Sequence, residues 1–203
     1  MILGVFLNAS FLPAGLVRID HALFYELNGQ WHNGFLDTVV PFLREPTVWV
    51  PFYFFLLLFS TINYKLKGWA WVLFFILTAI ITDQVSSHWL KDTFFRLRPC
   101  RDPDLAHQVR FLVSYCPMSS SFPSSHAVNH FGISTFIFVT FKKVMGRKWG
   151  FIFLWAAAIC YAQVYVGVHF PFDVFSGAII GIVLGFLTAS FFNKAIGLGP
   201  IVK

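Results

Sequence analysis

Five long apolar segments constrain this chain more than any other feature of its sequence. They cover residues 47–63, 69–90, 125–141, 149–168 and 174–192, and each approaches the roughly 20 apolar residues that a helix needs to cross a bilayer. Their apolar residues are continuous rather than alternating, which argues against membrane β-strands. The pattern predicts an all-α membrane helix bundle with about five transmembrane helices.

Composition supports one membrane domain covering residues 1–203. Hydrophobic residues make up 57% of the chain and charged residues 12%, whereas a soluble domain has roughly 25% charged residues. This balance excludes a disordered chain, a secreted disulfide scaffold and a soluble nucleic-acid binder, so no nucleic-acid partner is expected. Oligomeric state is not predicted.

The N-terminal region, residues 1–35, is predicted to lie at the membrane interface. Residues 1–17 are apolar but interrupted by Pro13 and Gly15, and they lack the basic start of a signal peptide. Ile19, Leu23 and Leu27 then recur at helical spacing. This spacing predicts an interfacial amphipathic helix over residues 19–29.

Basic residues predict the orientation. One end of the bundle carries seven of them, on short turns and after the last span: Lys65, Lys67, Lys142, Lys143, Arg147, Lys148 and Lys194. The terminal Lys203 follows. The positive-inside rule places that end, with the C-terminus, in the cytoplasm. The loop 91–122 and the turn 168–173 then face outward. Cys100 and Cys116 lie in this loop, where a disulfide and two free thiols are both possible, while no Cys/His spacing indicates zinc.

Three short polar segments meet at the outward end: residues 91–99, 122–126 and 163–173. Lys91 and Arg98 are cations suited to phosphate oxygens. Ser124 and Ser125 resemble a capped helix start, whose free N–H groups bind anions. Two histidines can divide the roles of nucleophile and general acid, and Asp173 follows His169 closely enough to orient it. The set indicates phosphoryl transfer with no obvious metal and no cofactor.

The motifs Lys91-x6-Arg98-Pro99, Pro123-Ser124-x-His126 and His169-x3-Asp173 resemble the three signatures of the type 2 phosphatidic acid phosphatase superfamily. The match runs from about residue 83 to 185. The resemblance implies that His169 is a nucleophile forming a phosphohistidine and that Asp173 orients it. It also implies that His126 protonates the leaving group. The implied phosphate-binding residues are Lys91, Arg98, Ser124, Ser125 and Gln163.

One departure concerns the third signature, which normally begins Ser-Arg and here reads Ala162-Gln163. The missing arginine would ordinarily bind the phosphate, and Gln163 offers only neutral hydrogen bonds, which are weaker. Arg96 or Arg101 is one hypothetical source of the missing charge.

The resemblance implies a membrane lipid phosphatase acting on a lipid phosphate or diphosphate. Undecaprenyl diphosphate is the first expectation; lipid A, phosphatidylglycerol phosphate and phosphatidate are alternatives. The expected location is the bacterial cytoplasmic membrane, with the site on the periplasmic or extracellular side. A catalytically silent lipid-phosphate binder and a small transporter are the rival functions.

Overall fold

The computed structural model describes residues 11–199, and this part of the chain is helical without any strand. Three of the predicted spans begin or continue through short 3-10 or π turns. The helices, in chain order, are α1 (Ala14–Phe24) with a π-helical extension (Tyr25–Gln30), α2 (Gly34–Leu43), a 3-10 turn (Pro46–Trp49), α3 (Val50–Tyr64), α4 (Leu66–Gln84) with a π-helical extension (Val85–Leu90), α5 (Lys91–Thr93), a 3-10 turn (Pro99–Arg101), α6 (Ser125–Met145), a 3-10 turn (Arg147–Phe151), α7 (Ile152–Tyr165) and α8 (Pro171–Ala195).

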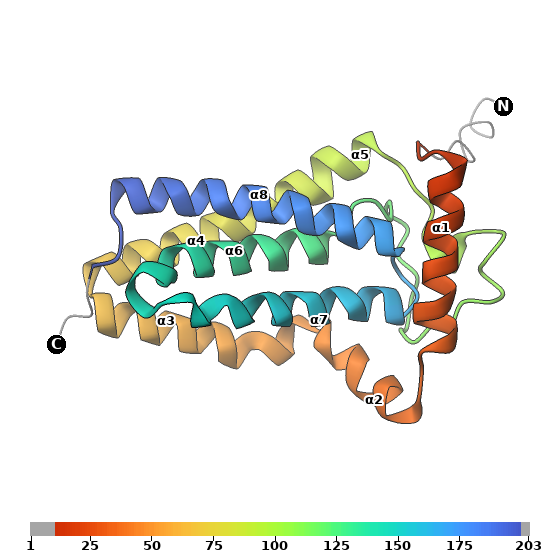
Figure 1. The fold of residues 1–203 in the computed structure, drawn as a ribbon, viewed down its shortest axis with the longest axis horizontal. Coiled ribbons are helices and arrows are strands. Elements are labelled where there is room, and N and C mark those ends of the chain that lie inside the picture. The colour runs from red at the N-terminus through yellow and green to blue at the C-terminus, as the bar shows by residue number, and fades with distance from the viewer. Residues whose placement is uncertain (1–10, 200–203) are drawn as a thin grey trace.

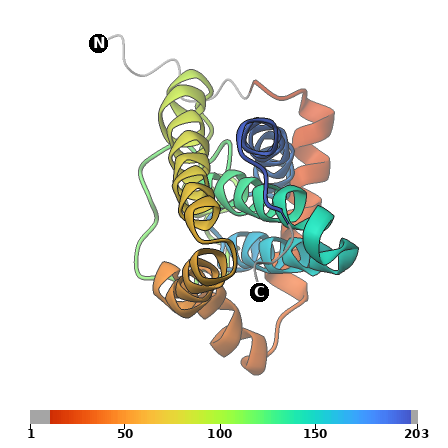
Figure 2. The same ribbon diagram turned by 90° about the vertical axis from the view of Figure 1, so that its left-hand side faces the viewer.

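Helix α6 forms the centre of the bundle. It packs against α4, α7 and α8, and Figures 1 and 2 show these helices running alongside it, with α3 beyond α4 and α7. Phe136 and Phe141 of α6 are fully buried with Trp71 of α4 in the main core. The indole N–H of Trp71 donates to the Thr140 hydroxyl at 2.8 Å, which satisfies a polar group that burial would otherwise leave without a partner.

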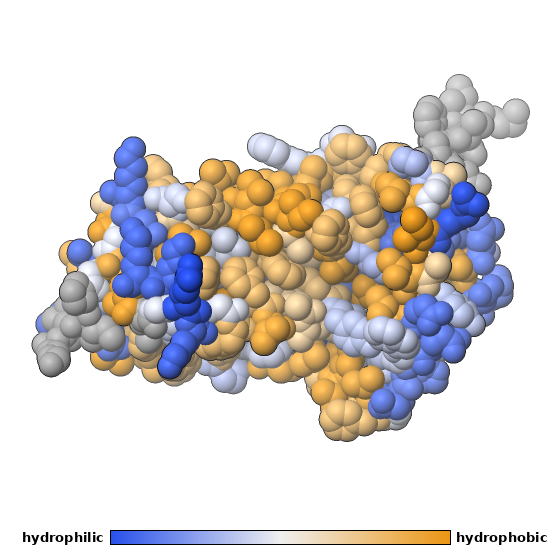
Figure 3. Space-filling model, viewed as in Figure 1, coloured by the Kyte–Doolittle hydropathy of each residue, from blue (hydrophilic) through white to orange (hydrophobic). Residues whose placement is uncertain are grey.

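On the face shown in Figure 3, apolar residues form a belt across the middle of the bundle, and hydrophilic residues collect at its two ends. In the described residues, three helical stretches are long and apolar enough to cross a membrane: Pro46–Tyr64, Leu66–Thr93 and Pro171–Ala195. They expose large apolar side chains such as Phe55, Leu73 and Ile182, as lipid-facing helices do. The all-α membrane fold is confirmed. The number of five spans remains a prediction, because α6 lies inside the bundle and α7 is short.

A ridge of glycines brings α8 unusually close to α6. A Cβ atom added at Gly181 would lie 2.4 Å from the Val128 carbonyl oxygen, and one at Gly185 would lie 2.2 Å from that of Gly132. Small residues permit this backbone approach between membrane helices. The close packing joins the two helix starts, where the Ser124 N–H donates to the Asp173 carbonyl at 3.1 Å. Two of the three sequence motifs are thereby brought together.

The N-terminal helices cover the end of the bundle that holds the motifs. Helix α1 crosses that end at a steep angle to the long helices (Figure 1). It starts at Ala14, earlier than the predicted residue 19, and its extension ends at Gln30. The predicted amphipathic pattern is present, because Ile19 and Leu23 are 59% and 50% exposed. The predicted interfacial segment also includes residues 1–10, which lie outside the described residues.

Helix α2 precedes the first predicted span. It is separate from that span and ends at Leu43. Pro46 lacks a backbone N–H and begins the following 3-10 turn, so the chain bends between α2 and α3. The bend places Arg44 at the motif-bearing end of the bundle.

Candidate active site

A tight turn between α7 and α8 carries His169. Its fold depends on Gly167, which has φ +83°, a conformation that favours glycine. The backbone N–H of His169 donates to the Gln163 carbonyl at 3.3 Å and closes the turn. Pro171 then starts α8 at a position where its missing N–H costs nothing. The histidine therefore lies at a rigid junction between two helices, where it is only 3% exposed.

Asp173 connects that turn to two other segments, those of Ser121 and Arg96. One carboxylate oxygen, Oδ2, accepts hydrogen bonds from the Phe170 N–H at 2.9 Å and from the Ser121 hydroxyl at 2.5 Å. It lies 3.7 Å from His169 Nδ1, an electrostatic contact rather than a hydrogen bond. The other oxygen, Oδ1, accepts from Arg96 at 2.7 Å. Asp173 therefore caps α8 and faces His169 at the same time.

The guanidinium of Arg98 fixes the orientation and tautomer of His169. Its Nη1 lies 3.1 Å from His169 Nε2. Because a guanidinium can only donate, Nε2 must accept and its lone pair points toward Arg98. The ring proton then belongs to Nδ1, on the side of Ser121 and Asp173. This is the tautomer in which Nε2 is available as a nucleophile.

Electrostatics keep this imidazole neutral. Burial and the positive charge of Arg98 lower the pKa of His169 to about 4. Burial likewise lowers the pKa of Arg98 to about 10, even though Asp173 opposes that shift. At neutral pH the site therefore contains an uncharged histidine beside a charged guanidinium, a combination suited to attack on an anionic phosphate.

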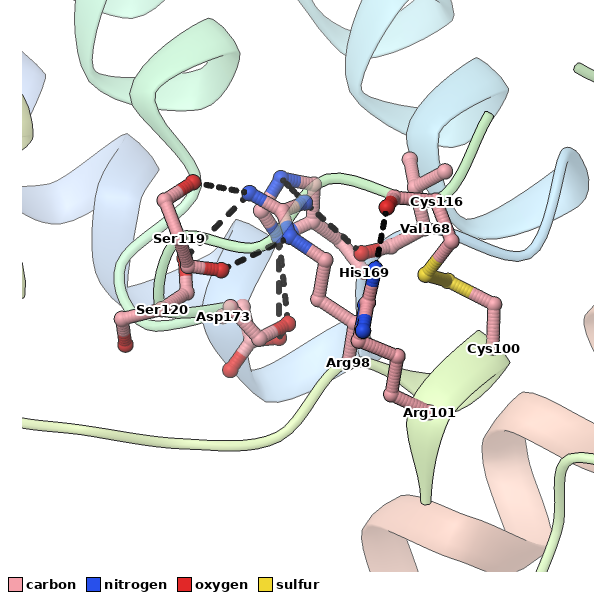
Figure 4. Close-up of a disulfide and its surroundings, with 10 residues drawn as sticks. Arg98, Cys100, Arg101, Cys116, Ser119, Ser120, Val168, His169 and Asp173 are labelled. Carbon is pink, nitrogen blue, oxygen red and sulfur yellow. Dashed lines mark hydrogen bonds and ion pairs between the residues drawn. A yellow bond between two sulfur atoms is a disulfide. The ribbon is translucent and has the colours of Figure 1, made fainter. Parts of the chain in front are cut away.

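Arg98 lies beside a disulfide, and its guanidinium is held by carbonyl oxygens from two neighbouring segments (Figure 4). Its N–H groups donate to the carbonyl oxygens of Ser119, Ser120 and Val168 at 3.0–3.3 Å. Cys100 and Cys116 are joined, so the disulfide, one of two open possibilities in the sequence, is present. The bond joins the segment that follows Arg98 to the segment that precedes Ser119 and Ser120.

His126 and the two serines lie at the start of α6. Ser124 occupies the N-cap position as predicted, but its hydroxyl makes no capping hydrogen bond and is buried without a partner. The expected side-chain cap is therefore wrong, and the helix start leaves its first N–H groups uncapped, as an anion site requires. The Ser125 hydroxyl contacts that of Ser87 at 3.0 Å. His126 is half-buried, and its carbonyl contacts the His130 ring at 2.8 Å.

Lys91 and Gln163 occupy the edges of this cluster. Lys91 is half-buried at the end of the α4 extension and interacts electrostatically with Arg98 and Asp173. Gln163 is fully buried in the last turn of α7, and neither polar atom of its side chain has a hydrogen-bond partner within residues 11–199. The structure thus brings all three motifs to one end of the bundle. Which of these residues bind phosphate remains a prediction.

Arg96 and Arg101 do not provide a free charge in place of the missing arginine. Arg96 donates to Asp173 at 2.7 Å and to Asp20 of α1 at 2.6 Å, and its guanidinium lies 4.1 Å above the Phe170 ring. Arg101 is exposed and donates to the Cys116 carbonyl. Arg96 instead holds the carboxylate of Asp173 through Oδ1, whereas the contact with His169 is made through Oδ2.

Sequence reasoning missed Asp20 and Ser121. Asp20 is 5% exposed, and it accepts from the Phe172 N–H at 2.8 Å as well as from Arg96. A usable signal was present, since Asp20, Phe24 and Asn28 recur at i, i+4 and i+8 and form the buried stripe of this helix. Burial raises the pKa of Asp20, and Arg96 opposes this shift. Ser121 precedes the second motif, and no spacing distinguished it from its neighbours.

Within residues 11–199, no group of three or more His, Cys, Asp or Glu side chains is arranged to hold a metal ion. The polar side chains of the cluster are cations, hydroxyls, two imidazoles, the carboxylate of Asp173 and the amide of Gln163. These are groups that bind and transfer a phosphoryl group directly.

Comparisons with known proteins find a family and relatives for this chain. The family model of the PAP2 superfamily matches residues 68–196. A lipid A 4'-phosphatase from Bacteroides thetaiotaomicron is 32% identical over 82% of this chain and 73% of its own length. An undecaprenyl-diphosphatase from Sulfolobus acidocaldarius is 29% identical over 84% of this chain and 74% of its own.

The fold has a solved counterpart. The crystal structure of a transmembrane PAP2-type phosphatidylglycerolphosphate phosphatase from Bacillus subtilis superposes with a TM-score of 0.68, at 22% identity, over 90% of this chain and 89% of that one. The motifs, their meeting at one end of the bundle and the family match lead to one conclusion: this chain is a membrane protein of the PAP2 superfamily.

Proposed function

We propose that this chain is a metal-independent lipid phosphatase that hydrolyses a lipid phosphate or diphosphate through a phosphohistidine on His169. The observation that carries the proposal is the contact of 3.1 Å between Arg98 Nη1 and His169 Nε2. It directs the lone pair of a neutral imidazole toward a cation, so a phosphate bound by Arg98 would meet the nucleophile directly.

In the first step, His169 Nε2 forms a bond to phosphorus and the bond from phosphorus to the leaving oxygen breaks. His126 transfers its proton to that oxygen. Asp173 stabilises the positive charge that develops on the His169 ring. Lys91, Arg98 and the N–H groups at Ser124 and Ser125 stabilise the charge on the phosphoryl oxygens.

In the second step, a water attacks phosphorus while His126 accepts its proton. The bond between His169 Nε2 and phosphorus breaks, and inorganic phosphate leaves. The imidazole returns to its neutral form, so the cycle requires no further reactant.

The site lies at one end of the apolar belt, where a lipid headgroup would be presented while its chains stay in the bilayer. The basic residues of the opposite end favour an extracytoplasmic location for the site, in a bacterial cytoplasmic membrane. Undecaprenyl diphosphate is the proposed first substrate, supported by the undecaprenyl-diphosphatase among the relatives. Lipid A is the second, supported by the 32% identity to a lipid A 4'-phosphatase.

The test is phosphate release by detergent-purified protein, with no added metal and with a chelator in a parallel assay. The panel contains undecaprenyl diphosphate, lipid A, phosphatidylglycerol phosphate and phosphatidate. Acid-labile, alkali-stable phosphate on the wild-type protein, absent from His169→Ala, would support the phosphohistidine. Activity lost to the chelator would contradict metal independence, and no release from any lipid would favour a silent binder.

A further inference from the structure

A cavity of about 490 Å³ adjoins His126, between the α2–α3 connection and the loop before the second motif. Pro41, Phe42, Leu112 and Val113 give it an apolar part; Arg44, Glu45, Ser114, Tyr115 and His126 give it a polar part. A cavity with both characters, next to the proposed proton donor, suits a phosphate ester with an apolar substituent.

Arg44 is the cation in the wall of this cavity. It is half-buried, it has no ion pair among the described residues, and its Nε is buried without a hydrogen-bond partner. A buried N–H of a charged group is costly to leave unpaired. Burial lowers the pKa of Arg44, and its charge in turn lowers the pKa of Arg98, so the two guanidinium groups are electrostatically coupled. A guanidinium in this setting is a binding group for an anion.

Gln163 leaves the site one cation short of the family pattern. Its side chain is neutral, fully buried and without a hydrogen-bond partner. Among the nearby arginines, Arg96 is committed to two carboxylates and Arg101 to a carbonyl oxygen. Arg44 has no such commitment.

We propose that Arg44 is a phosphate-binding residue of this site and supplies, from the α2–α3 connection, the cationic contact that Gln163 does not provide. The inference rests on the proposed function. Arg44 precedes the region 68–196 that the family model matches, so the motif pattern gives no indication of it. Its place beside His126 assigns it to the phosphate oxygens on the side of the leaving group.

The test compares Arg44→Ala, Arg44→Lys and Gln163→Arg with the combined variant Arg44→Ala/Gln163→Arg. The matched control is Arg18→Ala, which removes an exposed arginine from α1 at the same end of the molecule. We expect Arg44→Ala to lower kcat/KM by about 10- to 100-fold, the loss of one charged hydrogen bond. Arg44→Lys should lose less kcat/KM than Arg44→Ala. In the combined variant, Gln163→Arg should restore part of the lost kcat/KM, and Arg18→Ala should match the wild type.

A binding measurement separates this inference from the proposed function. Orthovanadate imitates phosphate, and its protection against thermal unfolding needs no lipid substrate. If Arg44→Ala needs at least tenfold more orthovanadate than the wild type for the same protection, and Arg18→Ala does not, the inference is supported even if no lipid is hydrolysed. Equal protection in both variants overturns it even if the wild type is an active phosphatase. A loss of activity in Arg44→Ala with unchanged vanadate protection also overturns it, because the residue would then act on structure alone.

Discussion

The two ends of the helix bundle carry the same basic residue types in opposite environments. At the end with the α3–α4 and α6–α7 turns, Lys65, Lys143 and Lys148 are exposed, and none forms an ion pair within the described residues. At the other end, Arg96 and Arg98 are 7% and 4% exposed and bind carboxylates, carbonyl oxygens and an imidazole. Basic side chains that are exposed to water anchor a membrane protein, whereas buried basic side chains need ion-pair and hydrogen-bond partners.

The largest expected effect lies at the buried end. We expect His169→Ala to lower kcat by at least about 10⁴-fold, because the variant loses the proposed nucleophile. Phosphate release is the measurement, and unchanged thermal unfolding is the control for folding. A variant that kept more than a tenth of wild-type activity would exclude His169 as the nucleophile.

Asp173→Asn tests the negative charge of the carboxylate that faces the ring of His169. The amide would keep the approximate shape but would remove the charge that stabilises the developing imidazolium, so we expect kcat to fall by about 10²- to 10⁴-fold. KM should change much less, since Asp173 faces the ring rather than the substrate. Equal losses in Asp173→Asn and in Asp173→Glu would instead indicate a purely structural role.

Arg96→Met tests the ion pairs through which Arg96 connects Asp20 of α1 to Asp173 of α8. It would leave two buried carboxylates, Asp20 and Asp173, without their shared cation. Breaking such a buried pair costs about 3–5 kcal/mol of the free energy of unfolding. Denaturant titration in detergent measures it. Adding Asp20→Asn to Arg96→Met should recover part of the loss; no recovery would show that Asp20 and Arg96 do not stabilise each other.

The pH profile tests the buried state of His169. Because its pKa is lowered to about 4, the imidazole is neutral above that pH and gains a proton below it. On this account kcat/KM stays level from neutral pH down to about 5 and falls about tenfold per pH unit below 4. Arg98→Gln removes a charge that lowers this pKa, so its acid limb should move to higher pH. An acid limb near the ordinary pKa of histidine in the wild type would contradict the buried, neutral imidazole.

Patterns within one helix or one motif were predictable from the sequence. Continuous apolar runs predicted helices in the regions of α3, α4, α6, α7 and α8. The spacing of His169 and Asp173 predicted that these two side chains face each other. The glycines spaced four residues apart in α8 indicate a close helix neighbour, but no local pattern specifies that this neighbour is α6, at the centre of the bundle. Asp20 and Arg44 reach the site across 153 and 125 residues of chain from Asp173 and His169, so only the folded structure brings them there.

The smallest expected effect lies at the exposed end, and it completes the comparison. Lys65→Ala and Lys143→Ala each remove a solvated charge that has no partner, so we expect kcat/KM within twofold of the wild type and a free energy of unfolding within about 0.5 kcal/mol. Their joint removal should act on insertion instead, since positive charge on short turns sets orientation. Cysteine labelling of a single engineered site on the α6–α7 turn, in intact cells, would measure the fraction of inverted molecules. A substantial loss of activity with unchanged orientation would show that the two ends are coupled through the bundle rather than independent.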